Sequence, residues 1–465
     1  MSQPARAHPF MPNSAPALKS ALLAELGLDS AEPLFGQIPE SHRFRGDLTQ
    51  PESLSSEVVL SRHMRDILAR NRPAADAISF LGGGCWHHYV PAVVDEIVGR
   101  SEFTTPVWGT PSSDFGRNQA WFEFTSQIGA LVEMDMVGLP VYSWGCAAGH
   151  AIRMAVRITD RQRILVPARM CPQRRAVIDN YCGSADPTAR IEVTAIACDE
   201  QGRLDVSALA KALNETIAAV YFENPSYLGG LELAAAEIAA SARSAGAETI
   251  VGVDPISLGV VLPPGAYGAD IVVGTTQPLG VHMSAGGGLG GFIATRHEPH
   301  YASEYPTLLN SITETVDGNT AFGLMLFHQS SYGSREYGKD WTGNSTYLWA
   351  IANSAYMGLM GPQGFQEIGA LIASRAHAAA SRLSGIPGLR VSLNGFFKEF
   401  VVNFDETGRS VSSINDALRA YDIFGGLDLS QSFPDMGQTA LYCVTEVHED
   451  GDIERLVAAL TEVLA

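Results

Sequence analysis

The sequence predicts an α/β protein with a mostly parallel, doubly wound sheet and a smaller C-terminal α+β domain. Two observations support this prediction. Between residues 76 and 330, short apolar segments alternate with segments of helical apolar spacing, a pattern typical of βαβ units around a parallel sheet. Between residues 331 and 465, a long helical segment leads into strands and helices that no longer alternate regularly. We therefore expect a large domain followed by a small one.

Residues 1–75 are expected to form a helical arm ahead of the large domain. Segments 16–28 and 56–71 both carry apolar residues at helical spacing. Asn13-Ser14 stands before the first segment and Ser55-Ser56 before the second, and both pairs can supply N-caps.

The expected strands and helices follow from apolar patterning. In the large domain, strands are predicted at 163–168, 191–198, 217–223, 248–254 and 270–274, and helices at 120–134, 147–158, 205–215 and 232–246. In the remainder, a long helix is predicted over 345–361 and 363–388, strands at 389–393, 399–404 and 440–446, and helices at 412–421 and 451–464. Because the large-domain strands are apolar throughout, we expect helices on both faces of their sheet.

The overall composition restricts the class of protein. The 465 residues are 46% hydrophobic and 17% charged, with a formal net charge of −19, which argues against nucleic acid or anionic membrane as a partner. No apolar run reaches the roughly 18 residues of a membrane span, and the first residues lack the apolar core of a secretory signal. The six cysteines have no metal-binding or disulfide spacing. These features predict a cytoplasmic protein without a metal site.

Two residues at strand ends suggest a cofactor. Asp254 ends the apolar segment 248–254. In enzymes that use pyridoxal phosphate (PLP), such an aspartate pairs with the pyridine nitrogen, and a lysine about two dozen residues later holds the cofactor as an imine. Here the later position is Gln277. Asp254 therefore either holds a pyridine nitrogen or caps its own turn, and Gln277 would lie beside it.

Further candidate residues surround the same strand ends. The loop containing Ser143, Gly145 and Cys146 precedes a helix, whose free N–H groups can bind phosphate; an ordinary strand–loop–helix turn is the alternative. His282 lies five residues beyond Gln277 and is expected to face the site as an acid–base group.

The lysines are few enough to consider one by one. The chain has four, Lys19, Lys211, Lys339 and Lys398. Lys339 is a candidate for an imine or a phosphate contact donated across a dimer interface, although it can equally be a solvated lysine before a helix. Lys398 is expected to be structural, and the other two lie on predicted exposed helix faces.

Several motifs occur in order along nearly the whole chain: "ISFLGGG", "HYVPAVVDEIVGRSEFTT", "GVDPISLGVVLPPGAYGADIVVG", "QPLGVHMSAGGGLGGFIATR", "FFKEFVV" and "GGLDLSQSFPDMGQTALYCVTE". With these motifs the chain resembles the first subunit of the two-subunit glycine decarboxylase, the P protein of the glycine cleavage system. The resemblance implies a fold-type I PLP-dependent transferase-like fold. It also implies that the cofactor lysine belongs to a homologous partner subunit, and that glutamine is usual at the position of Gln277.

The loops at strand ends depart from that family. The segment 102–124 lacks the family's tyrosines and contains Trp108, Asp114, Arg117 and Asn118 instead. Cys171-Pro172 replaces a His-Pro pair. Ligands bind at the carboxyl ends of strands in open α/β sheets. A chain that keeps the family's core motifs but has different loops at these strand ends is therefore expected to have altered chemistry or an altered partner.

Three functions follow from these observations. The first is a glycine-decarboxylase-like subunit 1 without the cofactor lysine, working in a PLP-dependent amino-acid decarboxylase or aminomethyl-transferring complex with a homologous lysine-bearing subunit. The second is a stand-alone homodimeric enzyme acting on a small amino-acid-derived metabolite in specialised metabolism. The third is a non-catalytic binding or assembly partner.

Overall fold

The computed structural model describes residues 7, 10–46, 49–51, 54, 56–73, 76–104, 111–325, 336, 338–340 and 346–465, with the backbone alone for residues 12 and 111–116. The chain divides into two compact units, Met1–Asn71 and Arg72–Ala465. The arm boundary predicted at residue 75 lies close to this division. The domain boundary predicted at residue 330 falls outside the described residues and stays a prediction.

Among the described residues of the first unit are the α-helices α1 (Pro16–Glu25) and α2 (Glu57–Leu68), and neither helix has a buried residue. Short 3-10 turns lie at Pro12–Ser14, Glu32–Phe35 and Glu40–His42.

The two predicted N-caps of this unit have different outcomes. The Ser56 side chain accepts a hydrogen bond from the Val59 N–H at 3.5 Å and caps α2, as predicted. The cap predicted for α1 is wrong, because the Ser14 hydroxyl donates to the Met11 carbonyl at 2.6 Å and Ala15 takes the N-cap position.

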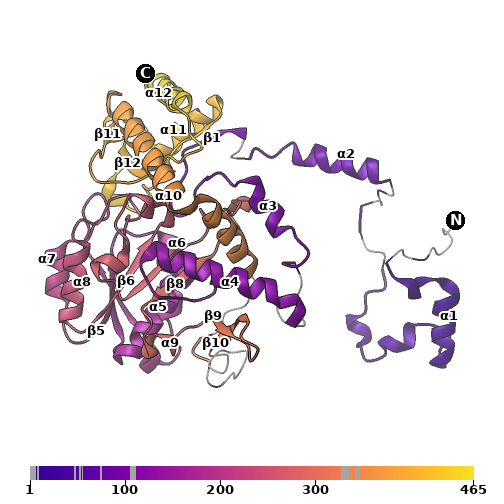
Figure 1. Ribbon diagram of the computed structural model, residues 1–465. Helices are drawn as coiled ribbons and strands as arrows, with labels where there is room; N and C mark the ends of the chain where they lie inside the picture. The colour runs from indigo at the N-terminus through magenta and orange to yellow at the C-terminus, as the bar shows by residue number, and fades with distance from the viewer. Residues whose placement is uncertain are drawn as a thin grey trace. The chain divides into compact units, whose positions relative to one another are not determined.

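A seven-stranded sheet forms the centre of the second unit (Figure 1). Its strands in spatial order are β2 (Met136–Val137), β8 (Gly291–Thr295), β7 (Ile271–Thr275), β6 (Glu248–Val253), β5 (Ile217–Glu223), β3 (Arg163–Pro167) and β4 (Glu192–Ile196). The five strands from β7 to β4 run parallel, whereas β8 is antiparallel to both of its neighbours. The predicted, mostly parallel sheet is confirmed.

Helices cover both faces of this sheet (Figure 1). They include α4 (Pro111–Val132), α5 (Trp144–Thr159), α6 (Pro172–Cys182), α7 (Val206–Ala212) and α8 (Ala235–Ser244). Side chains of each strand alternate between two separate cores: on β5, Val220 and Phe222 pack into one, while Ala219 and Tyr221 pack into the other. Apolar residues on both faces explain why these strands could be found as uninterrupted apolar runs.

The long helix α10 (Tyr347–Ser384) connects the large sheet to the C-terminal region. It is kinked at Gly361, where φ is 57° and ψ is −179°, just before Pro362. A glycine supplies this positive φ without a Cβ clash, and the proline cannot donate to the preceding turn. The kink separates the two helical segments that the sequence predicts.

The C-terminal region is built on a four-stranded antiparallel sheet in the order β11 (Arg390–Val391), β12 (Glu399–Asn403), β15 (Thr439–Cys443) and β14 (Leu427–Asp428). Helices α11 (Val411–Leu418) and α12 (Asp450–Leu464) pack with this sheet in one apolar core. Strand β1 (Ile78–Ser79) pairs in parallel with β13 (Ile423–Phe424), which ties the start of this unit to its last domain.

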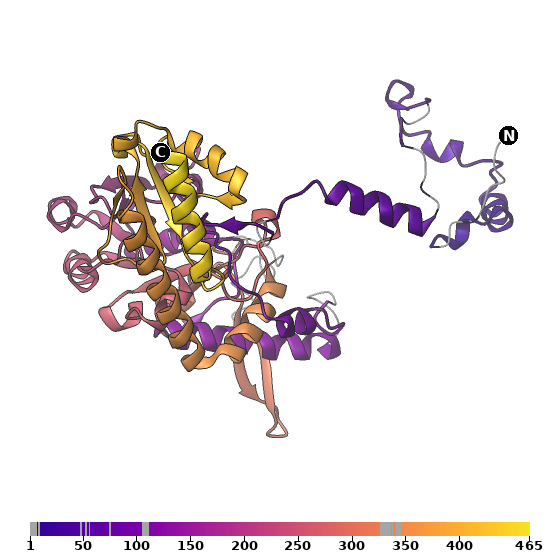
Figure 2. The same ribbon diagram turned by 90° about the horizontal axis from the view of Figure 1, so that it is seen from above.

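The remaining elements connect these layers. An antiparallel hairpin of β9 (Leu309–Glu314) and β10 (Thr320–Met325) projects from the body (Figure 2). Helices α3 (Ala92–Val98) and α9 (Pro299–Ala302) are short. Further 3-10 turns lie at Pro187–Ala189, Pro255–Gly259, Pro264–Tyr267, Ser284–Gly286, Asp405–Thr407, Arg419–Tyr421 and Pro434–Met436. Within the described part of the chain, no helix combines the length and the apolar character that crossing a membrane requires.

Candidate functional site

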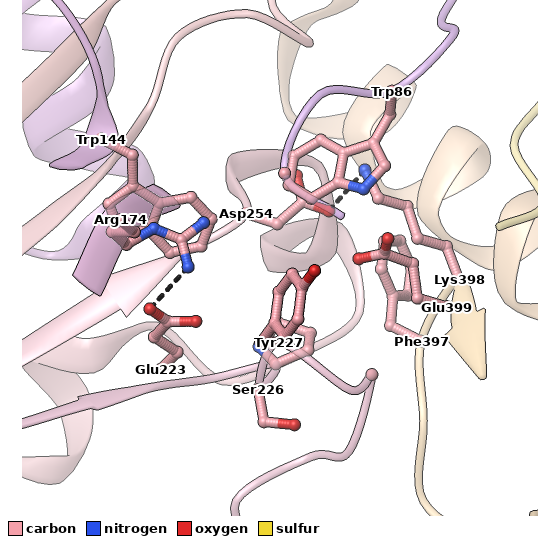
Figure 3. Close-up of a pocket in the computed structure, with 13 residues that line it drawn as sticks. Trp86, Trp144, Arg174, Glu223, Ser226, Tyr227, Asp254, Phe397, Lys398 and Glu399 are labelled. Carbon is pink, nitrogen blue, oxygen red and sulfur yellow. Dashed lines mark hydrogen bonds and ion pairs between the residues drawn. The ribbon is translucent and has the colours of Figure 1, made fainter. Parts of the chain in front are cut away.

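A small cavity lies where the carboxyl ends of β5 and β6 meet the loop after β1 and the start of β12 (Figure 3). Its polar and aromatic lining includes Trp86, Trp144, Arg174, Glu223, Tyr227, Asp254, Lys398 and Glu399. Open α/β sheets bind ligands at this end, so the cavity marks the candidate site. The space open to water centres is about 20 Å³, which is enough for roughly one water molecule.

The Gln277 side chain makes two hydrogen bonds to the main chain of Trp86, a residue that lines the site. Its Nε2 donates to the Trp86 carbonyl at 2.9 Å, and its Oε1 accepts from the Trp86 N–H at 3.1 Å. The Gln277 residue is 1% exposed and Trp86 is 3% exposed. The amide therefore satisfies both main-chain groups of a buried loop residue, and a lysine could not accept the second of these bonds.

Asp254 makes two contacts, one with each carboxylate oxygen. Its Oδ1 accepts from the Ile256 N–H at 3.1 Å, which is the turn cap that the sequence predicts as one alternative. Its Oδ2 lies 2.8 Å from Lys398 Nζ. Both side chains are buried, and Figure 3 shows them meeting beneath Trp86.

Lys398 has further contacts that complete its surroundings. Its Nζ lies 3.4 Å from the centroid of the Trp86 ring, a cation–π arrangement, and 3.0 Å from His88 Nε2. His88 Nδ1 in turn lies 2.7 Å from Glu446 Oε2. A line of polar side chains thus runs from the end of β6 to the segment after β15.

A second buried ion pair forms the opposite wall. Arg174 Nη1 donates to Glu223 Oε1 at 2.6 Å, and the Tyr221 hydroxyl donates to the same oxygen at 2.7 Å. Burial lowers the pKa of Arg174, but the charge of Glu223 and the neighbouring Tyr221 outweigh it and raise that pKa above its usual range. The guanidinium lies 3.7 Å from the centroid of the Trp144 ring, so the cation fills space beside the helix start.

Glu399 holds the glycine loop that follows β1. Its carboxylate accepts from the Gly83 N–H at 2.6 Å. Gly83 has φ +88°, a conformation that glycine adopts without strain. Burial raises the pKa of Glu399, and the nearby Lys398 charge and the Gly83 N–H only partly oppose this.

The predicted phosphate loop is a capped helix start. The Ser143 hydroxyl accepts from the Cys146 N–H at 3.2 Å, and Trp144, the first residue of α5, is buried beside Arg174. A Cβ on Gly145 would approach Val177 to 3.1 Å, so close helix packing already explains this glycine. Ser143, Gly145 and Cys146 stay a predicted phosphate site, with one of its N–H groups already hydrogen-bonded.

The two predicted catalytic residues lie outside this cavity. His282 is exposed, and its Nε2 lies 2.9 Å from Asp95 on α3; its acid–base role stays a prediction. Lys339 Nζ lies 3.2 Å from Glu304 Oε1, in an ion-pair cluster in which Asp340 also pairs with Arg157. Neither side chain meets Asp254 or Gln277.

Sequence reasoning missed most of the residues that fill the site. Glu223 is the last residue of β5, just as Asp254 directly follows β6. Because ligands bind at the carboxyl ends of strands in open α/β sheets, this position could have indicated Glu223. Lys398 was placed in the small domain, and it is there, but its side chain reaches the large sheet. Nothing in the local pattern of Trp86 or Arg174 indicates their partners.

PLP does not fit this site as described. A pocket for a small molecule or cofactor has roughly 300–1,000 Å³, against about 20 Å³ here. The end of the sheet is filled by two tryptophan rings and two ion pairs: Trp86, Trp144, Arg174–Glu223 and Asp254–Lys398. Among the described residues, no group of three or more histidine, cysteine, aspartate or glutamate side chains is arranged to hold a metal ion.

Comparisons with known proteins agree with this architecture. The model of the family "Glycine cleavage system P-protein" matches residues 9–460. A relative from Staphylothermus marinus, named probable glycine dehydrogenase (decarboxylating) subunit 1, is 33% identical over 98% of each chain. One of the same name from Pyrococcus furiosus is 34% identical over 98% of this chain and 99% of its own.

Solved structures give the same result. A crystal structure of glycine decarboxylase (P-protein) of the glycine cleavage system, in inhibitor-bound form, is similar with a TM-score of 0.87 and 31% identity, over 97% of this chain and 98% of that one. A sphingosine-1-phosphate lyase from Burkholderia pseudomallei has a TM-score of 0.63 at 17% identity, over 91% and 94% of the two chains, and shares the fold. The fold is thus that of fold-type I PLP-dependent enzymes. The chain belongs to the P-protein family of the glycine cleavage system.

Proposed function

We propose that this chain is the lysine-free subunit 1 of a two-subunit glycine-decarboxylase-type enzyme, and that a homologous lysine-bearing subunit holds PLP. Relatives that match the chain over nearly its full length carry the name probable glycine dehydrogenase (decarboxylating) subunit 1, which supports membership in such a complex.

The observation that supports it best is the double hydrogen bond of Gln277 to the Trp86 main chain. An amide nitrogen is not the amine that imine formation needs. Lys398, whose Nζ lies against the ring of the same Trp86, already contacts Asp254 and His88. Neither side chain is free to hold a cofactor covalently.

In the complex, PLP on the partner would act as the electron sink when an amino acid loses its carboxylate. This chain's residues have a different task. Gln277, Glu399 and the Asp254–Lys398 pair hold the loop after β1 and the small domain against the sheet. That gives the partner a rigid, homologous surface on which to assemble.

The substrate and compartment are inferred from further features. The changed segment 102–124 supports a substrate or carrier other than the family's usual one; its residues 105–110, including Trp108, lie outside the described part. All six cysteines are free thiols, which supports a reducing, cytoplasmic location.

The test is to co-express the chain with a homologous lysine-bearing subunit, purify the complex and reduce it with borohydride. The expected result is a fixed cofactor mass on the partner chain alone, with an absorbance band that this chain by itself does not develop when PLP is added. A cofactor mass on this chain would contradict the proposal and favour a stand-alone enzyme. Co-purification with a partner that also lacks the cofactor would favour an assembly role.

A further inference from the structure

We propose that Lys398 is a built-in counter-ion for Asp254, which takes the place of the charge that a cofactor would bring to this end of the sheet. The inference rests on the proposed function in one respect: this chain folds without PLP of its own. It assigns to one lysine the reason why a cofactor-free site of this family is stable.

The first step concerns the cost of the carboxylate. Asp254 is 3% exposed, and an unpaired buried carboxylate is strongly unfavourable. Its capping bond from Ile256 engages only Oδ1. Oδ2 faces the Lys398 ammonium at 2.8 Å, and no other ion pair of Asp254 occurs among the described residues. The cap alone therefore leaves the charge near Oδ2 uncompensated, and the Lys398 side chain compensates it.

The second step concerns the charge state of the lysine. An ammonium donates and cannot accept. Lys398 Nζ faces an oxygen of Asp254, the His88 Nε2 and the π face of Trp86, which are two acceptors and a surface that attracts cations. His88 can then carry its proton on Nδ1 and donate to Glu446. These three contacts are ones that a lysine side chain makes as a donor and as a counter-ion.

The third step concerns position. A pyridinium and an ammonium both bring a positive charge to a carboxylate, and Lys398 Nζ brings it to Asp254 Oδ2 as an ion pair at 2.8 Å. Lys398 lies just before β12, and its Nζ lies against the Trp86 ring (Figure 3). The lysine thus occupies the aspartate from the cavity side, where a ligand would have to approach.

The test is a double-mutant cycle on the full chain in cofactor-free buffer, with Lys398→Met, Asp254→Asn and the double variant. Each single variant leaves a buried charge unpaired, so its folding equilibrium constant should fall by at least about 100-fold. The double variant keeps the shape and the turn cap without either charge, and should lose far less than the product of the two single effects. Lys211→Met, at an exposed lysine on α7, is the matched control.

Two outcomes would overturn the proposal. The first is a double variant whose loss equals the product of the single losses, because such losses show no coupling. The second is failure of all three variants to fold. Failure of both single variants with recovery in the double variant supports the pairing.

A second measurement distinguishes the loss of the Lys398 charge from the loss of its packing. Lys398→Ala removes the atoms of n-propylamine, so n-propylammonium should raise the thermal midpoint of this variant by several degrees. It should not raise the thermal midpoint of the wild type or of Lys211→Ala. The uncharged n-propanol should raise the midpoint of Lys398→Ala much less. Equal rescue by the alcohol would overturn the charge role. An absorbance band on wild-type chain with added PLP would instead refute the proposed function, so the two failures are distinguishable.

Discussion

At the scale of single residues, Gln277 decides what the end of β7 can do. It joins two segments that lie 191 positions apart in the sequence, and it satisfies a main-chain donor and acceptor that are both buried. Asp254 likewise has both oxygens engaged. The same two positions that would hold a cofactor in a PLP enzyme therefore hold the fold together here.

Gln277→Leu should lower the free energy of unfolding by about 2–4 kcal/mol, because it leaves the Trp86 N–H and carbonyl buried without partners. Urea unfolding followed by tryptophan fluorescence measures this change. Gln119→Leu, at an exposed glutamine whose side chain donates to Glu123, is the matched control and should stay within about 0.5 kcal/mol. Equal effects of the two substitutions would show that the double hydrogen bond contributes nothing.

The sequence could place residues that directly follow an apolar strand, and their roles at the site stay predictions. Asp254 and Gln277 follow apolar strands, and parallel strands bring their carboxyl ends together. Lys398 could not be placed in the same way, because its contact with Asp254 joins two domains and depends on how β12 packs against the sheet. The exposed position of His282 depends on a turn that no apolar pattern marks.

At the scale of elements, the strands that are buried on both faces were the easiest to predict. β5 and β6 appear within the expected ranges because every residue faces one of two cores, or nearly so. β8 was missed, since a glycine-rich turn precedes it and hides its start. The β9–β10 hairpin was missed as well, because half-exposed strands outside the main sheet lack a continuous apolar run.

The start of α5 allows a test of its cap. Ser143→Ala removes the acceptor for the Cys146 N–H and should cost about 0.5–2 kcal/mol of stability. Thermal unfolding of the full chain measures the loss. Ser143→Thr keeps a capping hydroxyl and should recover most of the stability; if threonine and alanine behave alike, the hydroxyl is not the cause.

The start of β6 carries a pH-dependent group. Burial, together with the nearby charge of Asp270, raises the pKa of Glu248 to about 7, although the Tyr301 hydroxyl partly opposes this. The folded state therefore retains a proton that the unfolded chain releases at about pH 4.3. Stability from this group is fully present below that pH and is lost as the pH rises through about 7.

Glu248→Gln should therefore gain stability over the wild type as the pH rises, by about 3 kcal/mol between pH 4.5 and pH 8. Urea midpoints across this range measure the difference. The control is Glu215→Gln, an exposed change of the same chemistry. A constant difference between Glu248→Gln and the wild type at all pH values would contradict the assignment.

At the scale of the whole molecule, the first unit carries several exposed apolar side chains. On α2, Leu60, Met64 and Ile67 follow one another at helical spacing and are 43%, 44% and 41% exposed. Exposed apolar surface of this kind marks an interaction site. The unit 72–465 has its own apolar cores.

Met64→Asp should weaken the association of this chain with its partner subunit by tenfold or more, because a charge would have to be buried at the contact. Sedimentation or light scattering over a concentration series measures the change. The thermal midpoint of the second unit should not move. Arg62→Asp, which places the same new charge on another face of α2, is the control; equal weakening by both would point to overall charge instead of the apolar face.

Because the Asp254–Lys398 pair lies within one chain, the stability that it provides does not depend on the supply of a cofactor. A bound ligand stabilises a protein by an amount that rises with its concentration and vanishes when the ligand is scarce. A lysine within the same chain has no such dependence, because it is present in one equivalent from the moment of synthesis. Cells starved of vitamin B6 should therefore still accumulate this chain in its folded form.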